Sequence, residues 1–373
     1  MEWLAPIITP AAFGAMLGEL LLGKRLGNQA MAWGAALALA PWLLDGVAGW
    51  FLPTASQLAF HATATHSLLL AGTAAAVLPR WLAPHWKRSK LARGRIAWFV
   101  GLAWGIGALS SCLTTPGAQL CWPIPAPRAC ANMLGHGDAL PGLILAGFIP
   151  AIAILRTKKQ QPKRRRRWGW AIGLGSGYLA LVLAAKLLVG AAVTADLARR
   201  GIDHERCCVS PISWNPLLWR GLADGGDEVW LCHRSVWEWS STPILWTVLP
   251  RNREAFARHA ETREVRRIAA STDGWWICRP NKTGLWLADL RSGEQRVWGE
   301  RKGMVDIRFM HSWTFEPAST GDPVEPIRLT DRQPGEQLKR LARRSFANHQ
   351  TWDGLPRLAG VPGSLPEILR TRE

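Results

Sequence analysis

The chain has 373 residues and a formal net charge of +18, with 45 Lys and Arg against 27 Asp and Glu. Its mean hydropathy of +0.01 averages two unlike parts, because long apolar runs fill residues 1–195 and mixed, charged sequence follows. The basic residues cluster in short loops between apolar runs. This pattern indicates a membrane surface and argues against a basic nucleic-acid-binding face, so no nucleic-acid partner is expected.

Six apolar runs are long enough to be membrane-spanning helices, for which about 20 mostly apolar residues are needed. In chain order the runs are 5–22, 30–52, 64–84, 95–113, 138–155 and 168–190. Residues 1–195 are therefore predicted to form an all-α, multi-pass membrane bundle with about six spans. The first run follows no basic segment and ends without a small-residue cleavage site, so it is interpreted as a retained helix.

The loops between these runs alternate in charge. Segments 23–30, 80–95 and 156–167 are strongly basic, whereas 53–60 has no charge and 114–137 carries only Arg128. Because basic loops stay in the cytoplasm, we expect the N-terminus and everything after the sixth run to lie outside it. The chain is predicted to be a multi-pass protein of a bacterial inner membrane, with membrane lipid as its partner.

From about residue 196 the sequence changes to short runs rich in β-branched and aromatic residues, such as EVWLCHRSVWEW and DGWWICRP. This composition predicts strands. In the segment REAFARHAETREVRRIAA between them, the apolar residues have helical spacing. Residues 196–316 are therefore predicted to be a small α+β domain on the extracytoplasmic side. The Pro-rich, basic residues 317–373 are predicted to be a disordered tail with one short helix around GEQLKRLARRSF.

Four of the seven cysteines lie in the predicted outer domain: Cys207, Cys208, Cys232 and Cys278. Disulfides persist outside the cytoplasm, and adjacent cysteines do not easily pair with each other. A bridge from Cys207 or Cys208 to Cys232 or Cys278 is therefore one interpretation, and the sequence leaves the pairing open.

Ionisable residues are rare inside the predicted spans, where a charge at the bilayer centre costs about 2.5–3.5 kcal/mol. They are Glu19, Asp45, His66 and Lys186, with His61 just before the third span. Asp45, His61 and His66 approach the outer side and are the ligand types that bind Zn²⁺ or a similar divalent ion. The two histidines are five residues apart and do not share a helix face, so joint binding requires a helix start between them. An N-cap at Thr65 would supply it.

Each of these residues also has a plainer interpretation. Lys186 is expected to extend its amine to the outer interface. Glu19 lies near the cytoplasmic end of its helix, where it can cap or pair. A lone His61 is more often an interfacial histidine than a metal ligand.

The order of these segments resembles the YdjM-like, membrane-bound metal-dependent hydrolases, also described as LexA-binding, inner-membrane-associated hydrolases. TPAAFGAMLGELLLGKRLGN carries the family's opening pattern, including Glu19 and Asn28. HATATHS is similar to the family's His-Arg-Gly-x-Thr-His-Ser, and LTTPGAQLCWP to its Leu-Thr-Thr-x-Gly-x-Gln-Leu-x-Trp-Pro. Asn132 and Asp138 stand where the family has an Asn and, six residues on, an Asp. The resemblance covers roughly residues 9–316.

The resemblance implies a hydrolase that uses a divalent metal, such as zinc, on an ester or phosphoester of lipid-like character. It implies His61, His66 and Glu19 as metal ligands. As ligand, general base or substrate-orienting groups it implies Asp45, Asp138, Thr114, Thr115 and Gln119. The LexA contact is a family label, and the sequence identifies no soluble protein partner.

Several family positions are replaced in this chain. The Pro-Asp-x-Asp of the second span here reads PWLLD, so Asp45 is its only acid. Counting back from Gly117, the family's His-x-x-x-Asp falls on Gly107 and Ser111. Two functions therefore stay open: a metal-dependent hydrolase, or a degenerate member that keeps the bundle and outer domain as a membrane scaffold or binding protein.

Overall fold

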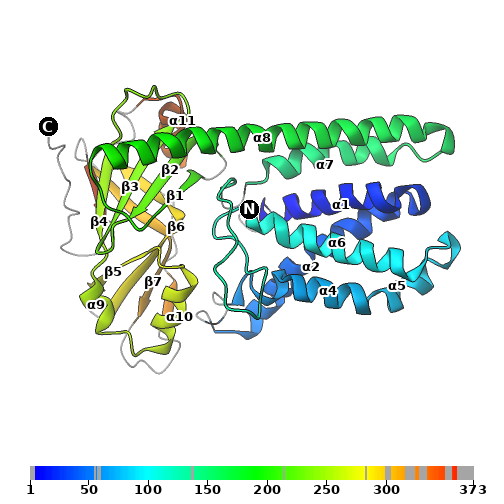
Figure 1. Ribbon diagram of the computed structural model, residues 1–373, viewed down its shortest axis with the longest axis horizontal. Helices are drawn as coiled ribbons and strands as arrows, with labels where there is room; N and C mark the ends of the chain where they lie inside the picture. Colours follow the sequence, from blue (N-terminus) through cyan, green and yellow to red (C-terminus); the bar gives the residue numbers. More distant parts are fainter. Residues whose placement is uncertain are drawn as a thin grey trace. The chain divides into compact units, whose positions relative to one another are not determined.

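The computed structural model describes residues 5–53, 56, 60–135, 138–212, 215–281, 284–298, 304–315, 324–326, 334–348 and 355–358 (Figure 1). The chain divides into two compact units. The first comprises Met1–Leu52 and Phe60–Val182, and the second comprises Pro53–Ala59 and Leu183–Glu373. The first unit is helical, and the second contains two β-sheets.

The helices of the first unit follow the apolar runs. They are α1 (Ala5–Leu26), α2 (Asn28–Phe51), the 3-10 turn η1 (Ala64–His66), α4 (Leu68–Val77), α5 (Pro79–His85), η2 (Lys87–Ser89), α6 (Arg93–Cys112), α7 (Leu140–Ala153), η3 (Lys158–Gln160) and α8 (Gln161–Arg199), whose last part belongs to the second unit. Among the described residues, α1, α2, α6 and α8 are long and apolar enough to cross a membrane, whereas α4 and α7 are shorter apolar helices. A helical membrane region with four candidate spans is thus confirmed, and the count of six spans stays a prediction.

The third and fifth predicted runs form shorter helices than expected. The third is divided at Pro79, which begins α5 directly after Leu78 ends α4. A proline is tolerated in the first turn of a helix, where its missing N–H has no partner, but it does not continue one. α7 likewise begins only at Leu140, with Pro141 in its first turn.

Small residues let the first helices approach closely. A Cβ on Gly14 would overlap the backbone oxygen of Gly34, and one on Gly18 would overlap that of Ala30, so α1 and α2 are in backbone contact. Such contacts are typical of helices in lipid, where the apolar surroundings supply no hydrophobic drive for association.

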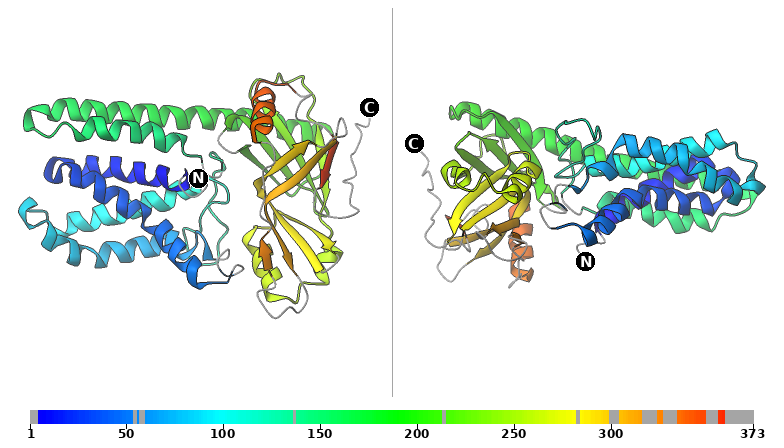
Figure 2. Two further views of the ribbon diagram at one scale, coloured as in Figure 1. Left: turned by 180° about the vertical axis from the view of Figure 1, so that it is seen from behind. Right: turned by 90° about the horizontal axis from the view of Figure 1, so that it is seen from below.

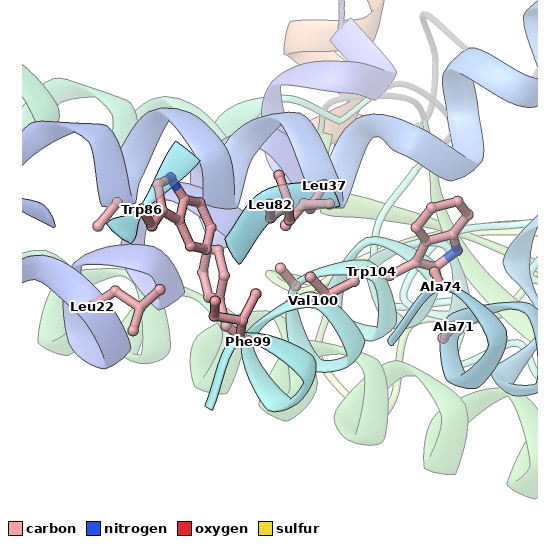
Figure 3. Close-up of a cluster of buried hydrophobic side chains, with 12 residues drawn as sticks. Leu22, Leu37, Ala71, Ala74, Leu82, Trp86, Phe99, Val100 and Trp104 are labelled. Atoms are coloured by element: carbon pink, nitrogen blue, oxygen red, sulfur yellow. The ribbon is translucent and has the colours of Figure 1, made fainter. Parts of the chain in front are cut away.

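A buried apolar cluster joins α1, α2, α4, α5 and α6 (Figure 3). Trp86 and Phe99 lie in it with ring centroids 6.0 Å apart. Trp104, at the other end of the cluster, donates from Nε1 to the carbonyl oxygen of Thr65 at 3.0 Å. The cluster therefore anchors η1, which carries the histidine-containing segment.

The second unit contains two sheets (Figure 2). The first is antiparallel, in the order β1 (Arg206–Ile212), β2 (Asn215–Asp224), β3 (Glu228–Ser235) and β4 (Trp246–Pro250). The second has β5 (Trp276–Asn281), β6 (Gly284–Trp298), β7 (Met304–Phe315) and β8 (Val324–Pro326) in antiparallel order, with β9 (Leu355–Leu358) parallel to β7. Leu222 and Leu231 of the first sheet pack with Ile277 and Phe309 of the second in one buried core.

Helices complete this unit. α9 (Arg253–Ala257) and α10 (Arg263–Ser271) replace the single helix expected between the strands, and α11 (Pro334–Ser345) is the helix predicted around GEQLKRLARRSF. The small β-containing domain is confirmed. The segment expected to be a disordered tail also contributes β8 and β9 to the second sheet.

The cysteines of the second unit do not form the bridge considered from the sequence. Cys207, Cys208, Cys232 and Cys278 are free thiols. β2 separates the strands of Cys207 and Cys232, which places those strands roughly 9–10 Å apart, whereas a disulfide needs Cα atoms within about 7 Å. Burial raises the pKa of Cys207 to about 11 and that of Cys278 to about 12, so both stay protonated at neutral pH.

Asp224 ends β2 and binds two arginines. Its Oδ1 lies 2.9 Å from Arg251 Nη2, and its Oδ2 lies 3.1 Å from Arg206 Nε. Burial by itself raises the pKa of this carboxyl, but the hydrogen bonds from Arg251 and from the Gly226 amide outweigh burial, so the pKa is lowered overall. A lowered folded-state pKa stabilises the fold above the unfolded value of about 3.9, and this stability disappears as the pH falls through the folded value.

Asp224→Asn is therefore expected to lower the free energy of unfolding by about 1.5–2 kcal/mol at pH 7, the contribution of hydrogen bonds to a charged group. The difference in the free energy of unfolding between the variant and the parent protein becomes smaller as the pH falls below about 4. Thermal unfolding in detergent between pH 3 and pH 7 measures it. Asp227→Asn, at an exposed position, is the control. A difference that stays constant over this pH range contradicts the assignment.

Candidate functional site

Asp45, near the end of α2, is the centre of a buried polar network. Its Oδ2 accepts a hydrogen bond from the backbone N–H of Ala62 at 2.8 Å, and its Oδ1 accepts one from the Thr65 hydroxyl. His61 Nδ1 lies 3.1 Å and His66 Nδ1 3.6 Å from the same Oδ2. One acid thus gathers both histidines of the HATATH segment.

The α-helix of this segment, α4, begins after both histidines and not between them. The Thr65 hydroxyl is committed to Asp45, and Ser67 is the N-cap of α4, where its hydroxyl accepts from Leu70 N at 3.1 Å. The expectation that Thr65 caps this helix is therefore wrong. Ser67 is the residue that faces the unpaired N–H groups of the first turn of α4, and a serine hydroxyl is a favoured acceptor there.

The two histidines have different surroundings. His66 is fully buried, whereas 38% of the His61 side chain is exposed. Trp42 stands edge-on to both rings, with centroids 5.4 Å from His66 and 5.9 Å from His61. Within the described part of the chain, the buried atoms His66 Nε2 and Trp42 Nε1 have no hydrogen-bond partner.

This arrangement does not fit a resident zinc ion. Two histidines that share a tetrahedral Zn²⁺ hold their ring centroids about 5 Å apart, because each Zn–N bond is ~2.0–2.1 Å. The centroids of His61 and His66 are 6.5 Å apart, and both oxygens of Asp45 already accept hydrogen bonds. Among the residues that the structure describes, no group of three or more His, Cys, Asp and Glu is placed to hold a metal ion.

The positions where the resemblance implies a His and an Asp are part of helix packing. Gly107 on α6 is buried against α2, and a Cβ there would overlap the backbone oxygen of Ala38. Ser111 is buried one turn further on. A histidine at position 107 is incompatible with the present approach of α2 and α6.

Glu19 is held by Arg164 of α8 and not by the histidines. Arg164 Nε donates to Glu19 Oε1 at 2.6 Å, and its Nη2 pairs with Oε2. Arg164 Nη1 also donates to Asn28 Oδ1 at 2.9 Å and to the carbonyl oxygens of Ile152 at 3.2 Å and Leu155 at 3.0 Å. The Arg164 side chain is 2% exposed, so this is a buried ion pair that joins α1, α7 and α8.

The Thr-Thr-Pro-Gly segment after α6 is held by its own polar contacts. The Thr114 hydroxyl donates to the Ser111 carbonyl at 2.9 Å, and the Thr115 hydroxyl donates to Asn132 Oδ1 at 2.6 Å. Gln119 is joined to the histidine-containing segment through its backbone N–H, which donates to the Ala62 carbonyl at 2.9 Å. Its side chain instead donates to the Ala126 carbonyl at 3.1 Å.

Asp138 lies directly before Ala139, the N-cap of α7. Its Oδ1 accepts from Leu140 N at 2.9 Å, and its Oδ2 lies 3.4 Å from the hydroxyl of Tyr178 on α8. Its carbonyl accepts from the Thr9 hydroxyl at 3.3 Å. The predicted acids and histidines are thus distributed over three networks, around Asp45, Glu19 and Asp138, while Thr114, Thr115 and the Gln119 side chain make their contacts within the segment after α6.

Two residues of these networks were not predicted from the sequence: Arg164 and Tyr178. Arg164 lies in the run KRRRR, where charge alone predicts an exposed loop. Tyr178 is the only tyrosine of the chain, which was the available signal for its role.

Comparisons with known proteins support the resemblance noted in the sequence. No curated protein and no solved structure matches the chain. A family model described as YdjM inner membrane protein matches residues 6–189, which run from α1 to α8 and include the networks around Asp45, Glu19 and Asp138. Residues 6–189 are therefore similar to the YdjM inner membrane protein family, and the match supports a YdjM-like membrane protein.

Proposed function

We propose that this chain is an inner-membrane scaffold or binding protein that has lost the metal-dependent hydrolysis implied by its family resemblance. The observation that supports this proposal most directly is the hydrogen bonding of the Asp45 carboxylate. Both oxygens of its buried carboxylate accept hydrogen bonds from the HATATH segment, through Ala62 N and the Thr65 hydroxyl. With His61 Nδ1 at 3.1 Å from Oδ2, three of the roughly four acceptor sites of this carboxylate face the HATATH segment, where they stabilise its turn.

The packing of α6 supports the same proposal. Gly107 occupies the position of the implied histidine and lies in backbone contact with α2. When a small residue on which helix packing depends replaces a metal ligand, the replacement is hard to reverse, because the packing then requires the small residue. Loss of single supporting groups around a metal typically lowers affinity or activity 10–100-fold, and loss of direct ligands lowers it further.

The proposal includes six spans, with α4–α5 as the third and α7 as the fifth. α4 and α5 together are about 27 Å long at 1.5 Å per residue, close to the ~30 Å hydrocarbon core. Trp81 on α5 is exposed near a basic loop, as are Trp98 on α6 and Trp170 on α8. Exposed tryptophans are typical of a membrane interface, so these three, each next to a basic loop in the sequence, are assigned to the cytoplasmic side.

Reporter fusions test this topology. Fusions after Arg95 and Lys163 are expected to be cytoplasmic, and fusions after Gly137 and Trp219 extracytoplasmic, because only then do all basic loops share the cytoplasmic side. The fusion after Arg95 separates six spans from four: if α4–α5 does not cross, that reporter lies outside. An extracytoplasmic reporter at Arg95 or a cytoplasmic one at Trp219 contradicts the proposed arrangement.

The second candidate is the metal-dependent hydrolase, with zinc or a similar ion near His61 and His66. The observation that favours it is the buried His66 Nε2, which has no partner within the described residues. An ion that binds only the folded protein would stabilise it by about 4 kcal/mol at a concentration 1,000 times its Kd.

Metal analysis and thermal unfolding separate the two candidates. For the scaffold, purified protein in detergent is expected to carry no stoichiometric metal, and added Zn²⁺ or Mn²⁺ should leave the Tm unchanged after chelator treatment. His66→Gln is the matched variant of the parent protein, since it removes the imidazole and keeps a polar side chain of similar size. Near-stoichiometric metal that disappears in a His61→Ala/His66→Ala protein would overturn the scaffold proposal.

A further inference from the structure

α11 presents an exposed apolar stripe edged by basic residues. Leu338 is 67% and Phe346 68% exposed, and Ala342 between them is exposed as well. Their spacing of four residues places Leu338 and Ala342 on one helix face, and Phe346 follows directly after the helix end at Ser345. Lys339 and Arg343 each follow a stripe residue and are also exposed. Helices with an apolar stripe bordered by Lys and Arg are typical of membrane surfaces.

Polar contacts on the opposite face hold α11 on its domain. Arg344 is buried, pairs with Glu238 and donates from Nη2 to the His233 carbonyl at 2.8 Å. The Ser345 carbonyl accepts from the Ser235 hydroxyl. The helix is therefore fixed in rotation, and the apolar stripe is its outer face.

The same contacts place two exposed tryptophans beside the helix end. Trp237 and Trp239 flank Glu238, the partner of Arg344, and are 58% and 81% exposed. Arg234 is buried beneath them and donates to the Trp239 carbonyl at 2.8 Å. The Trp237 backbone N–H donates to the Ser235 hydroxyl at 3.2 Å. The loop is thus held in a defined shape that displays both indole rings.

We propose that these residues form a docking face for an anionic lipid surface. The face, called here the α11 face, consists of Leu338, Lys339, Ala342, Arg343, Phe346, Trp237 and Trp239. Each part matches a bilayer interface: indole rings prefer the headgroup level, the apolar stripe inserts shallowly, and basic side chains bind anionic headgroups.

The chain itself brings a bilayer to this face. α8 is a candidate membrane span, and its segment from Leu183 onward belongs to the same unit as α11. Asp196 of that segment accepts from Trp246 Nε1 at 2.9 Å, so the domain is packed on it. Within this unit, Figures 1 and 2 show α11 level with that segment of α8 and not beyond its end. Tethering to a span makes docking intramolecular, which compensates for the small area of the α11 face.

A photocrosslinker at Phe346 tests the proposal in the full chain. The protein carries p-benzoylphenylalanine at this position and is reconstituted in nanodiscs of phosphatidylethanolamine with phosphatidylglycerol. We expect irradiation to give adducts with lipid. The crosslinker at Leu181, exposed on the membrane-spanning part of α8, is the positive control, and at Met310, exposed on β7, the negative control.

Charge reversal tests the headgroup contact. Each basic residue near an anionic surface contributes about a fivefold factor, so Lys339→Glu/Arg343→Glu is expected to lower the lipid-adduct yield at Phe346 at least tenfold. Arg263→Glu/Arg266→Glu, an equal charge change on exposed residues of α10, should leave the yield unchanged. Unchanged thermal unfolding of both variants shows that the domain is intact.

Three outcomes overturn the proposal. The first is an absence of lipid adducts at Phe346 while Leu181 gives them. The second is adducts with protein, which would assign the α11 face to a second copy or a soluble partner. The third is an equal fall in yield for both charge-reversed variants. None of these outcomes depends on whether the Asp45 network binds metal, so they test the lipid-docking proposal independently of the scaffold proposal.

Discussion

Arg164→Met is expected to lower the free energy of unfolding by roughly 3–5 kcal/mol, because it leaves a buried carboxylate without its partner. Arg164 supplies both hydrogen bonds to Glu19 and also covers the carbonyl groups of Ile152 and Leu155 at the end of α7. Removing it takes this donor from four acceptors: the Glu19 carboxylate, Asn28 Oδ1 and the carbonyl oxygens of Ile152 and Leu155. Denaturant or thermal unfolding in detergent measures the change.

The same basic run provides matched controls. Arg165→Met and Arg166→Met remove the same charge from exposed neighbours and are expected to change stability by less than about 0.5 kcal/mol. Combining Arg164→Met with Glu19→Gln should recover part of the loss, because the unpaired charge is then removed as well. If all three single variants unfold alike, the Arg164–Glu19 pair does not hold the helices together.

Gly107→Ala is expected to destabilise the protein by about 3 kcal/mol, at the upper end of ordinary overpacking. The added Cβ overlaps the backbone oxygen of Ala38, which cannot move without separating α2 from α6. Gly105→Ala is the matched control on the same helix, since no atom lies near its added Cβ. That substitution should stabilise the protein by up to about 1 kcal/mol, the difference in helix propensity. The changes in Tm of the two variants relative to the parent protein are expected to have opposite signs.

Gly107→His extends this test to function. If the implied histidine is simply absent, restoring it together with Ser111→Asp should create metal binding without loss of fold. The packing at Gly107 predicts the reverse, namely loss of folded protein and no gain of metal. A stable Gly107→His/Ser111→Asp protein that binds zinc contradicts the packing argument at Gly107.

The helical membrane region and its order were predictable from the sequence, because hydropathy and loop charge act locally. Apolar runs such as 30–52 and 95–113 correspond closely to α2 and α6, and the amphipathic GEQLKRLARRSF forms α11. The contact of Asp45 with the HATATH segment brings together three residues that the sequence singles out as candidate ligands. Each of these features is set by composition within a window of one helix or one loop.

Other features depended on which side chains meet in the folded chain. Thr65 and Ser67 are both good N-cap residues, and Asp45 decided between them by binding the Thr65 hydroxyl. Arg164 is one of several arginines in its run, and only the meeting of α1, α7 and α8 selects it for Glu19.

The amino-acid sequence by itself determined the helical membrane region, the β-containing domain and the amphipathic character of α11, since hydrophobic pattern and propensity are properties of short segments. The tertiary structure alone decided that Gly107 is a contact between helices, that the acids separate into three networks, and that the α11 stripe is the outer face of its helix. Burial and pairing of a polar group depend on residues far away in the chain, and no local pattern records them.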